Sequence, residues 1–354
     1  MKKILVISTQ TIGGCFIYAD NIISNLKSDI EVVIPEKVYE TCNTKPNWTF
    51  KYNGYSKFVR IFSCFILLIK IFIKGVCGNY DSLLLFGITK LDYFILKIWR
   101  LCNGKSFIVI HDGKMHIGEE NGAFVKQTIK MMELCTSIIF LSEYVRNLTL
   151  VNFGIDKPYI IAPHGLIDYG NIGSNSTDQM NQKPILLFLG RISKYKGIEL
   201  LLEALGHVDK SIYKEVIIAG KWSYEIPEIP SNLKIKIINR WLSDDEITNL
   251  ISISDIMLFP YLEASQSGVA TVAINYLKPS IVTSVGAFKE QFVDGTALFT
   301  DTKASDLASA ITNLCKNSYL RQTLINNLKL LRSQYSWENI ANNLEVAVRA
   351  STEV

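Results

Sequence analysis

The sequence contains no Cys-x-x-Cys pair, and its seven cysteines are scattered along the chain. Disulfide frameworks of exported proteins use even numbers of cysteines, and structural zinc sites use closely spaced ones. Here the number is odd, with cysteines at positions 15, 42, 64, 77, 102, 135 and 315. This usage fits a reducing cytosol and argues against a structural zinc site. No pair of acidic residues suited to holding a metal is evident either.

Long hydrophobic runs are also missing. The start, MKKILVIS, is basic, but its apolar run is too short for a signal peptide, so we expect a buried strand there. The segment 58–74, FVRIFSCFILLIKIFIK, has a charge-free run of only nine residues between Arg60 and Lys70. A membrane span needs roughly 20. No nucleic-acid-binding module or aromatic-basic RNA signature is present, so nucleic acid is not an expected partner.

Positive charge is concentrated in one part of the chain. Residues 51–105 hold 9 basic and 2 acidic side chains, although the formal net charge of all 354 residues is only +4. At about 100° per residue, the polar side chains of segment 57–74 share one helix face. These are Lys57, Arg60, Ser63, Lys70 and Lys74. The pattern predicts a basic amphipathic helix on an anionic membrane leaflet; the alternative is a crossover helix packed on its sheet, with its lysines in water.

Short apolar runs alternate with helical patterns almost throughout the chain. The first half has such runs at 4–8, 31–35, 82–87, 106–112, 137–142 and 159–165. The second half has them at 184–190, 215–220, 233–239, 255–260, 279–284 and 297–300. Helical segments such as 198–205 and 244–253 separate them. Continuous apolar strands joined by helical crossovers predict parallel sheets.

A polar segment divides the chain. Residues 168–184, DYGNIGSNSTDQMNQKP, lack periodicity and are typical of a linker. We therefore expect two doubly wound, Rossmann-like α/β domains, residues 1–167 and 184–335, joined by the linker 168–183. Residues 336–354 should form a final helix with Ser336 as its N-cap. In such domain pairs, ligands bind in the cleft at the carboxyl ends of the strands.

Two strand ends carry features that favour anion binding. After the first strand, Gly13 and Gly14 would let a ligand approach the backbone at a helix N-terminus, although a purely structural turn is an equal alternative. The segment GRISKYKG, residues 190–197, places Arg191 and Lys196 beside the next helix's amides, which suits a diphosphate. The alternative for that segment is a solvated loop whose charges have no role.

Histidines follow two strands of the first half. His111 and Asp112 end the run 106–112, His116 follows closely, and His164 ends the run 159–165. A His-Asp pair can do acid–base work or hold a substrate hydroxyl. A single histidine of this kind is more often structural, but three at strand ends of one domain should face the same cleft. Zinc binding is a further alternative, which no ligand spacing supports.

The segment YLEASQSGVA, residues 261–270, follows a buried strand that Pro260 ends. It holds one acid, Glu263, among small residues and hydrogen-bond donors. With the other segments it resembles a known family. The stretches LGRISKYKGIELLLEAL, IIAG, LSDDEITNLISISDIMLFPYLEASQSGV and KPSIVTSVGAFKEQFVDGTALF are similar to the donor-binding half of retaining glycosyltransferases of family 4. These have the two-domain GT-B fold, in which the last helix typically crosses back to the first domain.

The resemblance implies a role for each site residue. Arg191 and Lys196 would neutralise the departing nucleoside diphosphate, and Glu263 would face hydroxyls of the donor sugar or the ribose. The residues implied in catalysis are His111, Arg191, Lys196 and Glu263. Those implied in donor binding are Gly13, Gly14, Gly190, Gly220, Ser265, Gln266, Ser267 and Gly268, and those on the acceptor side are Asp112, His116 and His164.

One departure from the family pattern concerns the ribose. The common pattern has a second glutamate after seven intervening residues, and this glutamate binds the ribose. Counted from Glu263, that position is Thr271, and no acid occurs between 264 and 289. A branch with an E/D-A-S/T-Q-S-G loop, often with HD…H in the first domain, matches this chain. The missing acid leaves the nucleotide's identity open.

We therefore expect sugar transfer from a nucleoside-diphosphate donor to a hydroxyl of a glycan acceptor, with retention and without a metal or other cofactor. The acceptor is expected to be polyprenyl-linked, in the synthesis of a bacterial O-antigen, capsule or exopolysaccharide. The expected location is cytoplasmic, peripheral on the inner face of the plasma membrane. One alternative is a GT-B sugar-nucleotide epimerase or phosphorylase, and another is a non-catalytic sugar-nucleotide-binding partner.

Overall fold

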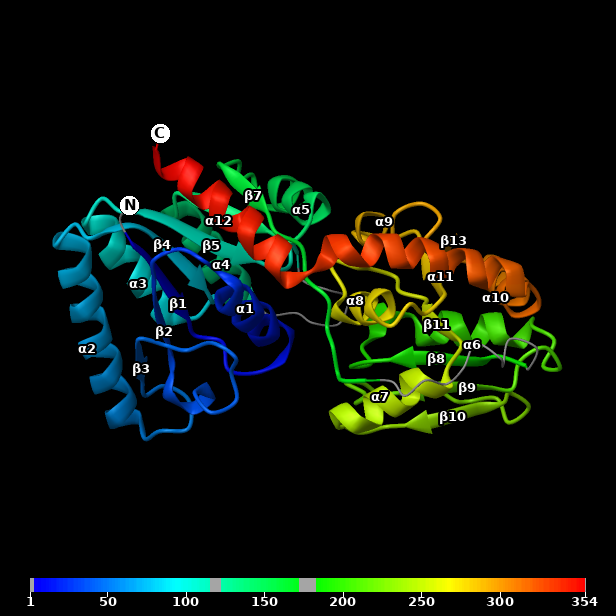
Figure 1. Ribbon diagram of the computed structural model, residues 1–354. Coiled ribbons are helices and arrows are strands. Elements are labelled where there is room, and N and C mark those ends of the chain that lie inside the picture. Colours follow the sequence, from blue (N-terminus) through cyan, green and yellow to red (C-terminus); the bar gives the residue numbers. More distant parts are fainter. Residues whose placement is uncertain (1–2, 115–121, 172–182, 354) are drawn as a thin grey trace. The chain divides into compact units, whose positions relative to one another are not determined.

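The computed structural model describes residues 3–114, 122–171 and 183–353, which form two compact units (Figure 1). Unit 1 contains the described residues 3–114, 122–165 and 336–353. Unit 2 contains 166–171 and 183–335. The chain leaves unit 1 after Gly165 and returns to it at Ser336. Most of the expected linker lies outside the described residues.

Unit 1 is built on a parallel sheet of seven strands in the order β3-β2-β1-β4-β5-β6-β7. The strands are β1 (Lys3–Ser8), β2 (Ile30–Pro35), β3 (Trp48–Phe50), β4 (Tyr80–Phe86), β5 (Lys105–Ile110), β6 (Ser137–Phe140) and β7 (Tyr159–Ile161). The helices are α1 (Gly13–Asn25), α2 (Lys57–Val76), α3 (Lys90–Leu101), α4 (Gly122–Leu134), α5 (Glu143–Phe153) and α12 (Trp337–Glu353). The doubly wound parallel arrangement confirms the expected fold class.

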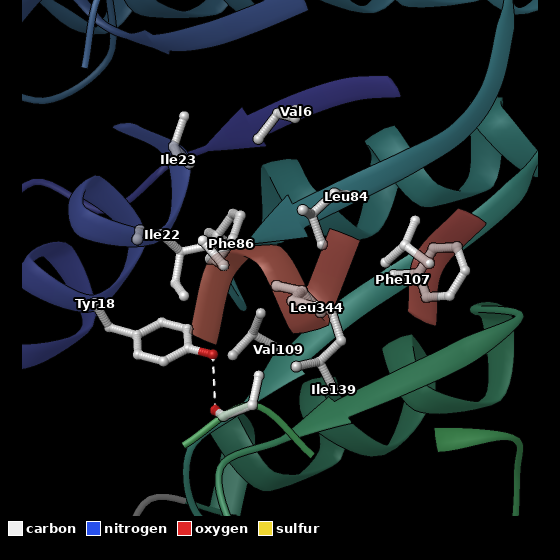
Figure 2. Packing of buried hydrophobic residues seen from close by; sticks show 14 of the residues in the cluster. Val6, Tyr18, Ile22, Ile23, Leu84, Phe86, Phe107, Val109, Ile139 and Leu344 are labelled. Atoms are coloured by element: carbon white, nitrogen blue, oxygen red, sulfur yellow. Dashed lines mark hydrogen bonds between the residues drawn. The ribbon is translucent and has the colours of Figure 1, made fainter. Parts of the chain in front are cut away.

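The sheet of unit 1 is buried on both faces because its strands are continuously apolar. Successive residues point to opposite sides, so Val6 belongs to one core cluster and Leu5 to the other. Figure 2 shows the first cluster, where Leu344 of α12 packs among side chains of β1, β4, β5 and β6. In the same cluster, Tyr18 of α1 donates a hydrogen bond of 2.9 Å to the carbonyl of Ala162. The final helix is therefore part of the core of unit 1.

Unit 2 has a parallel sheet of six strands in the order β10-β9-β8-β11-β12-β13. The strands are β8 (Ile185–Leu189), β9 (Glu215–Ala219), β10 (Ile235–Ile238), β11 (Ile256–Phe259), β12 (Ser280–Thr283) and β13 (Leu298–Thr300). The helices are α6 (Ile198–Gly206), α7 (Asp244–Ile253), α8 (Gly268–Asn275), α9 (Phe288–Gln291), α10 (Ala304–Lys316) and α11 (Ser318–Arg332). The twelve strands expected from the sequence are all present, whereas β3 was not expected.

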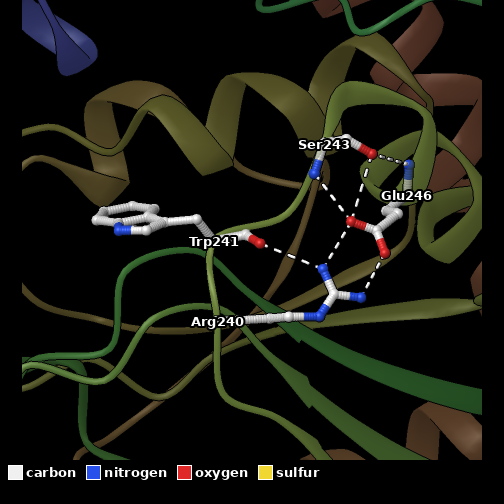
Figure 3. A network of polar contacts seen from close by, with 4 residues as sticks. All are labelled: Arg240, Trp241, Ser243 and Glu246. Atoms are coloured by element: carbon white, nitrogen blue, oxygen red, sulfur yellow. Dashed lines mark hydrogen bonds and ion pairs between the residues drawn. The ribbon is translucent and has the colours of Figure 1, made fainter.

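Local sequence signals fix where the helices begin. Helix α7 starts with a capping box, in which Ser243 accepts from the Glu246 amide and the Glu246 carboxylate accepts from the Ser243 amide. Arg240, just after β10, donates to the same carboxylate at 2.8 Å and to the carbonyl of Trp241 at 3.2 Å (Figure 3). The guanidinium and the Ser243 amide lower the pKa of Glu246 to about 2. This network holds the β10–α7 connection.

Helix α2 forms as predicted and packs on unit 1 through Leu67 and Ile71, and its contact with a membrane stays a prediction. Lys57, Arg60 and Lys70 are exposed, as both alternatives expected. Lys74, on the face expected to contact water or lipid headgroups, pairs with Glu31 of β2 at 2.5 Å. The ammonium of Lys70 lies 4.9 Å from the ring centroid of Trp48 on β3. Leu67 and Ile71 are the buried residues of α2, and many of its other apolar side chains are exposed.

Candidate functional site

Each sheet has one point where the strand order reverses. In unit 1 it lies between β1 and β4, and in unit 2 between β8 and β11. Loops that leave the carboxyl ends of these strands diverge to opposite faces and leave a crevice, where open α/β sheets bind ligands. The sequence-predicted site residues follow these strands and their neighbours, so each unit has its own candidate half-site.

In unit 2, the backbone itself shapes the end of β8. Gly190 has φ of 115°, and Gly220, after β9, has φ of 142°. A Cβ on Gly220 would lie 2.0 Å from the carbonyl oxygen of Gly190. Both conformations strongly favour glycine, and the second position has no space for a side chain. The two predicted donor-binding glycines therefore let neighbouring strand ends approach closely.

Lys196 is the buried cation of this half-site. It ends a short 3-10 helix, η3 (Lys194–Lys196), and is 7% exposed. Its ammonium donates to the hydroxyl of Tyr261 at 3.0 Å and lies 4.8 Å from that ring's centroid. It also lies 3.5 Å from the position of a Cβ on Gly190. The ammonium is thus held at the carboxyl end of β8, whereas Arg191 is exposed in the same loop.

The loops after β8 and β11 touch through their backbones. Gly197 has φ of 69°, and a Cβ there would lie 1.9 Å from the carbonyl oxygen of Pro260. The amide of Leu262 donates to the carbonyl of Tyr195 at 2.7 Å. These contacts join the two loops and place Lys196 beside the segment that leads into the Glu263–Gly268 loop.

The loop from Glu263 to Gly268 ends in the N-cap of α8. Ser267 caps this helix by accepting from the amide of Ala270. The side chain of Gln291, on α9, accepts from the Ser267 amide at 2.9 Å and donates to the Ser267 carbonyl at 3.1 Å. The first turn of α8 contains no acidic residue, so its amides form a positive end. That end lies at the reversal point.

The polar residues of this loop differ in burial. Ser265 and Ser267 are buried, whereas Glu263, Gln266 and Gly268 are partly exposed. Thr271 is fully buried in α8, and its hydroxyl donates to the carbonyl of Gly268 at 2.8 Å. The threonine at the position of the missing second acid therefore faces the helix backbone.

In unit 1, His111 directly follows β5 and contacts α1. Its ring lies edge-on to Tyr18, with centroids 5.2 Å apart. Its other neighbour is Cys15. Burial opposes charge on both groups, but their mutual attraction and hydrogen bond prevail, so the pKa of Cys15 is lowered and that of His111 is raised. Asp112 adds to the raised pKa of His111 and is itself exposed.

The glycines that precede Cys15 border open space. Gly13 begins α1 with φ of 75°, and a Cβ on Gly13 or Gly14 would meet no atom within 4 Å. The N-cap of α1, Ile12, supplies no side-chain hydrogen bond to the first turn. This end of the helix is therefore open to a ligand that approaches the backbone.

His164 lies deeper than His111. It is 5% exposed, its Nδ1 is 2.8 Å from the carbonyl oxygen of Gly165, and its ring centroid is 5.1 Å from that of Trp337 on α12. Burial lowers the pKa of His164 to about 4. The structure thus brings His111 and His164 together around Tyr18. His116 lies outside the described residues.

Three residues of these half-sites were not singled out by the sequence analysis. Tyr261 and Gln291 hold Lys196 and Ser267, and Cys15 pairs with His111. Tyr261 is the first residue of the recognised segment 261–270 and Cys15 directly follows Gly14, so their positions after strands were a usable signal. Gln291 had no such signal, because it reaches Ser267 across 24 residues. Within the described residues, no three side chains of His, Cys, Asp or Glu gather as a metal site requires.

Residues 174–330 match the model of the family described as glycosyl transferases group 1. This range contains the Lys196 loop, the Glu263–Gly268 loop and α8. A protein of Methanocaldococcus jannaschii named uncharacterized glycosyltransferase MJ1178 is 26% identical over 206 residues. The aligned segment spans 57% of this chain and 56% of that relative. The chain thus spans about half the length of this curated relative, and its segment 174–330 is similar to group 1 glycosyl transferases.

Solved structures show the fold of the whole chain. HepE of Anabaena in complex with UDP is 14% identical with a TM-score of 0.74, and the match covers 99% of this chain and 100% of HepE. The lipopolysaccharide outer core galactosyltransferase WaaB is 11% identical with a TM-score of 0.69, over 99% of each chain. The two doubly wound units therefore have the GT-B fold.

Proposed function

We propose that this protein transfers a sugar from a nucleoside-diphosphate donor to a hydroxyl of a glycan acceptor. The observation that supports this most strongly is the arrangement around Lys196. A buried ammonium held by Tyr261 and the N-terminal end of α8 both lie at the reversal point of one sheet. Preorganised positive charge of this kind stabilises a departing diphosphate.

In the proposed reaction, unit 2 binds the donor. The Lys196 ammonium and the exposed Arg191 guanidinium take the phosphate oxygens, and the α8 amides near Ser267 and Gly268 donate to them. The bond from the anomeric carbon to the phosphate oxygen breaks, and the electron pair leaves with the diphosphate. The oxygen of the acceptor hydroxyl forms the new bond to the anomeric carbon, and its proton passes to the departing phosphate oxygen. Protein cations then neutralise the leaving group without a metal, and we propose that the anomeric configuration is retained.

The partly exposed Glu263 is proposed to accept hydrogen bonds from hydroxyls of the donor sugar or the ribose. Thr271 is buried with its hydroxyl on Gly268, so ribose binding is assigned to another group. UDP is the first nucleotide to test, since HepE was crystallised in complex with UDP. Gly190, Gly220, Ser265 and Gln266 complete the proposed donor side.

Unit 1 is proposed to bind the acceptor or the transferred sugar. The raised pKa of His111 and the exposed Asp112 beside it suit a site that exchanges hydrogen bonds with sugar hydroxyls. Gly13 and Gly14 offer open backbone to a phosphate or acceptor. His164 is proposed to position His111 through Tyr18, and His116 is kept as an acceptor-side proposal on sequence grounds.

We further propose a lipid-linked acceptor, used in the synthesis of a bacterial surface polysaccharide at the cytoplasmic face of the plasma membrane. The basic region 51–105 supports this setting. No helix in the described part of the chain is long and apolar enough to cross a membrane.

The test combines binding and turnover. Nucleoside diphosphates and their sugar conjugates are screened for an increase in the thermal unfolding midpoint. Transfer is then measured for Arg191→Ala and Lys196→Ala, with Lys194→Ala as a matched control on the same 3-10 helix. We expect a loss of about 100-fold or more for the first two variants and little change for the control. Near-normal transfer by both would reject the proposal.

Assays with and without acceptor separate the two alternatives. Donor consumption that is independent of any acceptor would favour an epimerase or phosphorylase. Nucleotide binding without release of free nucleoside diphosphate would favour a non-catalytic partner.

A further inference from the structure

Helix α2 has an exposed side that is apolar from end to end. Between Phe58 and Val76 it exposes ten large apolar side chains, all Phe, Ile or Val. The most exposed are Phe58, Val76, Phe62 and Phe65, at 81%, 62%, 59% and 59%. A water-facing helix normally turns such residues inward. Contiguous apolar patches of this kind mark interaction surfaces.

The inward side of α2 explains this orientation. Lys74 pairs with Glu31 and donates to the hydroxyl of Tyr80 at 3.0 Å, and Lys70 lies over the ring of Trp48. These contacts tie Lys70 and Lys74 to β2, β3 and β4. The apolar side cannot rotate inward without breaking them, so it is a fixed property of the folded unit.

A groove adjoins this surface. It lies between α2 and the edge strand β3, has a volume of about 440 Å³, and is lined by side chains that include Phe58, Phe62 and Trp48 together with Lys51, Lys70 and Glu36. Figure 1 shows α2 beside β3 at the border of unit 1. The exposed Lys57 and Arg60 lie at the amino end of α2, and the helix contains no acidic residue. The surface is thus apolar in the middle and mainly basic at its edges.

This chemistry matches a lipid bilayer better than a second copy of the chain. The exposed side chains of the apolar surface offer no hydrogen-bonding group, whereas protein interfaces carry about one hydrogen bond per 100–200 Å². Two copies joined through this surface would bring Lys57, Arg60 and Lys70 of both chains together with no acid on α2 to pair them. Like charges at a symmetric contact disfavour it. Anionic lipid headgroups pair with such a rim while acyl chains receive the apolar side chains.

We propose that the outer side of α2 is a membrane-docking surface. The helix lies parallel to the membrane plane with its Phe and Ile side chains in the acyl layer, and the basic edge residues contact anionic headgroups. Docking is therefore driven mainly by apolar insertion, with a smaller electrostatic contribution. The outer side of α2 would thus provide the membrane contact that the proposed function includes, and in this respect the proposal rests on that function. Vesicle binding can nevertheless be measured without any sugar substrate.

The test uses the full chain and vesicle flotation. Vesicles are made of phosphatidylcholine alone or of phosphatidylcholine mixed with phosphatidylglycerol, at low and high salt. We expect binding to both, stronger to the anionic vesicles, and high salt should remove only the difference between them. The double variant Phe58→Glu, Phe65→Glu should bind both types at least about tenfold more weakly. Both side chains are mainly exposed, so folding should be retained, which circular dichroism checks.

Three control variants keep the result interpretable. Phe58→Leu with Phe65→Leu preserves apolarity and should bind like the wild type. Leu330→Glu places the same charge on an exposed apolar position of α11 in unit 2 and should also bind normally. Phe65→Trp should show a blue shift on vesicles and quenching by brominated acyl chains, which reports insertion without adding a charge.

Several outcomes would overturn the proposal. One is normal binding by the Phe58→Glu, Phe65→Glu variant; another is binding only to anionic vesicles that high salt abolishes. A dimer in light scattering that the same variant dissociates, without vesicle binding by the wild type, would assign the surface to a second copy. Transfer to an acceptor without a lipid tail tests the glycosyltransferase assignment separately, so failure of docking and failure of the proposed function are distinguishable.

Discussion

The ammonium of Lys196 and the hydroxyl of Tyr261 are joined by a hydrogen bond of 3.0 Å at the carboxyl ends of β8 and β11. Burial raises the pKa of Tyr261, so its phenol stays protonated and its oxygen accepts from the ammonium. The two residues come from different loops, and the backbone contact between Gly197 and Pro260 fixes those loops together. Lys196 is therefore positioned before any ligand arrives.

The first prediction concerns this pair. Tyr261→Phe removes a partner of the ammonium but keeps the ring, and should lower transfer about tenfold because a hydrogen bond to a charged group contributes about 1.5–3 kcal/mol. Tyr213→Phe is a matched control, since Tyr213 is buried in unit 2 and its hydroxyl has no hydrogen-bond partner among the described residues. Steady-state transfer rates at equal protein stability check the difference. Equal losses in both variants would contradict a role for the pair.

A second prediction concerns Gln291, which holds both backbone groups of Ser267. Gln291→Leu removes two buried hydrogen bonds and should lower the free energy of unfolding by about 2 kcal/mol. Without these two hydrogen bonds to Ser267, the N-terminal end of α8 should bind phosphate less well. KM for the donor should therefore rise by a larger factor than kcat falls. Gln291→Glu keeps the acceptor for the Ser267 amide and should be intermediate. A donor KM equal to that of the wild type would show that the Gln291 hydrogen bonds are only structural.

A third prediction separates the two roles proposed for Glu263. Glu263→Gln keeps the size of the side chain and removes its charge. If it faces the sugar, transfer should fall about 100-fold while calorimetric affinity for the free nucleoside diphosphate stays unchanged. If it faces the ribose, that affinity should fall as well. Normal transfer and normal affinity would remove Glu263 from the site.

Two glycines at the ends of α6, its N-cap Gly197 and its last residue Gly206, give opposite stability predictions. Gly197→Ala places a Cβ 1.9 Å from the Pro260 carbonyl at positive φ, and should cost about 2 kcal/mol or more of the free energy of unfolding. Gly206, the last residue of α6, has open space around its Cβ position. Gly206→Ala should therefore stabilise the protein by up to about 1 kcal/mol. Urea unfolding of both variants checks the signs, and a neutral Gly197→Ala would refute the close contact.

The buried His164 predicts a pH dependence of stability. In the unfolded chain the imidazole binds a proton near its ordinary pKa of 6.5, whereas in the folded protein it does so only near 4. Between these values the unfolded state holds more protons, so the free energy of unfolding decreases as the pH falls from 6.5 to 4, by about 3 kcal/mol from this group. His164→Leu should lose this dependence in urea titrations at pH 7 and pH 4.5.

Two comparisons make that measurement specific. The Asp92 carboxyl, whose pKa burial raises to about 6, acts in the opposite sense over the same range, but it is present in both proteins and cancels in their difference. His207→Leu, at an exposed histidine, is the control for replacing a histidine by leucine as such. An unchanged profile in His164→Leu would contradict the burial of that imidazole as a neutral group.

The sequence predicted what is encoded locally. Continuous apolar runs located twelve strands, and the helix predicted over 244–253 has those bounds in the structure. Strand β3 was missed because Trp48–Phe50 is too short for a periodic signal and is recruited by pairing with β2. The site motifs were recognised because their residues follow strands directly. Their roles stay predictions, as does the identity of the group that binds the ribose.

What the sequence could not provide depends on contacts between distant residues. The helical wheel of α2 grouped its polar side chains, but only the structure shows that Lys74 pairs with Glu31 while Lys57 and Arg60 stay exposed. Likewise, nothing local links Gln291 to Ser267 or Tyr261 to Lys196. In each case the contact partner of the residue comes from a segment that is distant in the sequence and that the fold brings close.

The two chain connections between the units lie where the units could be separated by protein engineering. The amide of Leu166 donates to the carbonyl of Tyr335 at 3.0 Å, so unit 2 begins and ends at neighbouring points. In unit 1, Gly165 and Trp337 meet at the same place, where a Cβ on the glycine would lie 2.4 Å from the indole. Unit 2 is thus a domain inserted into the chain of unit 1, between Gly165 and Ser336. A short linker from residue 165 to residue 336 would therefore make unit 1 a single continuous chain without unit 2. Because the two ends of unit 2 lie close together, unit 2 is suited to separate expression or circular permutation.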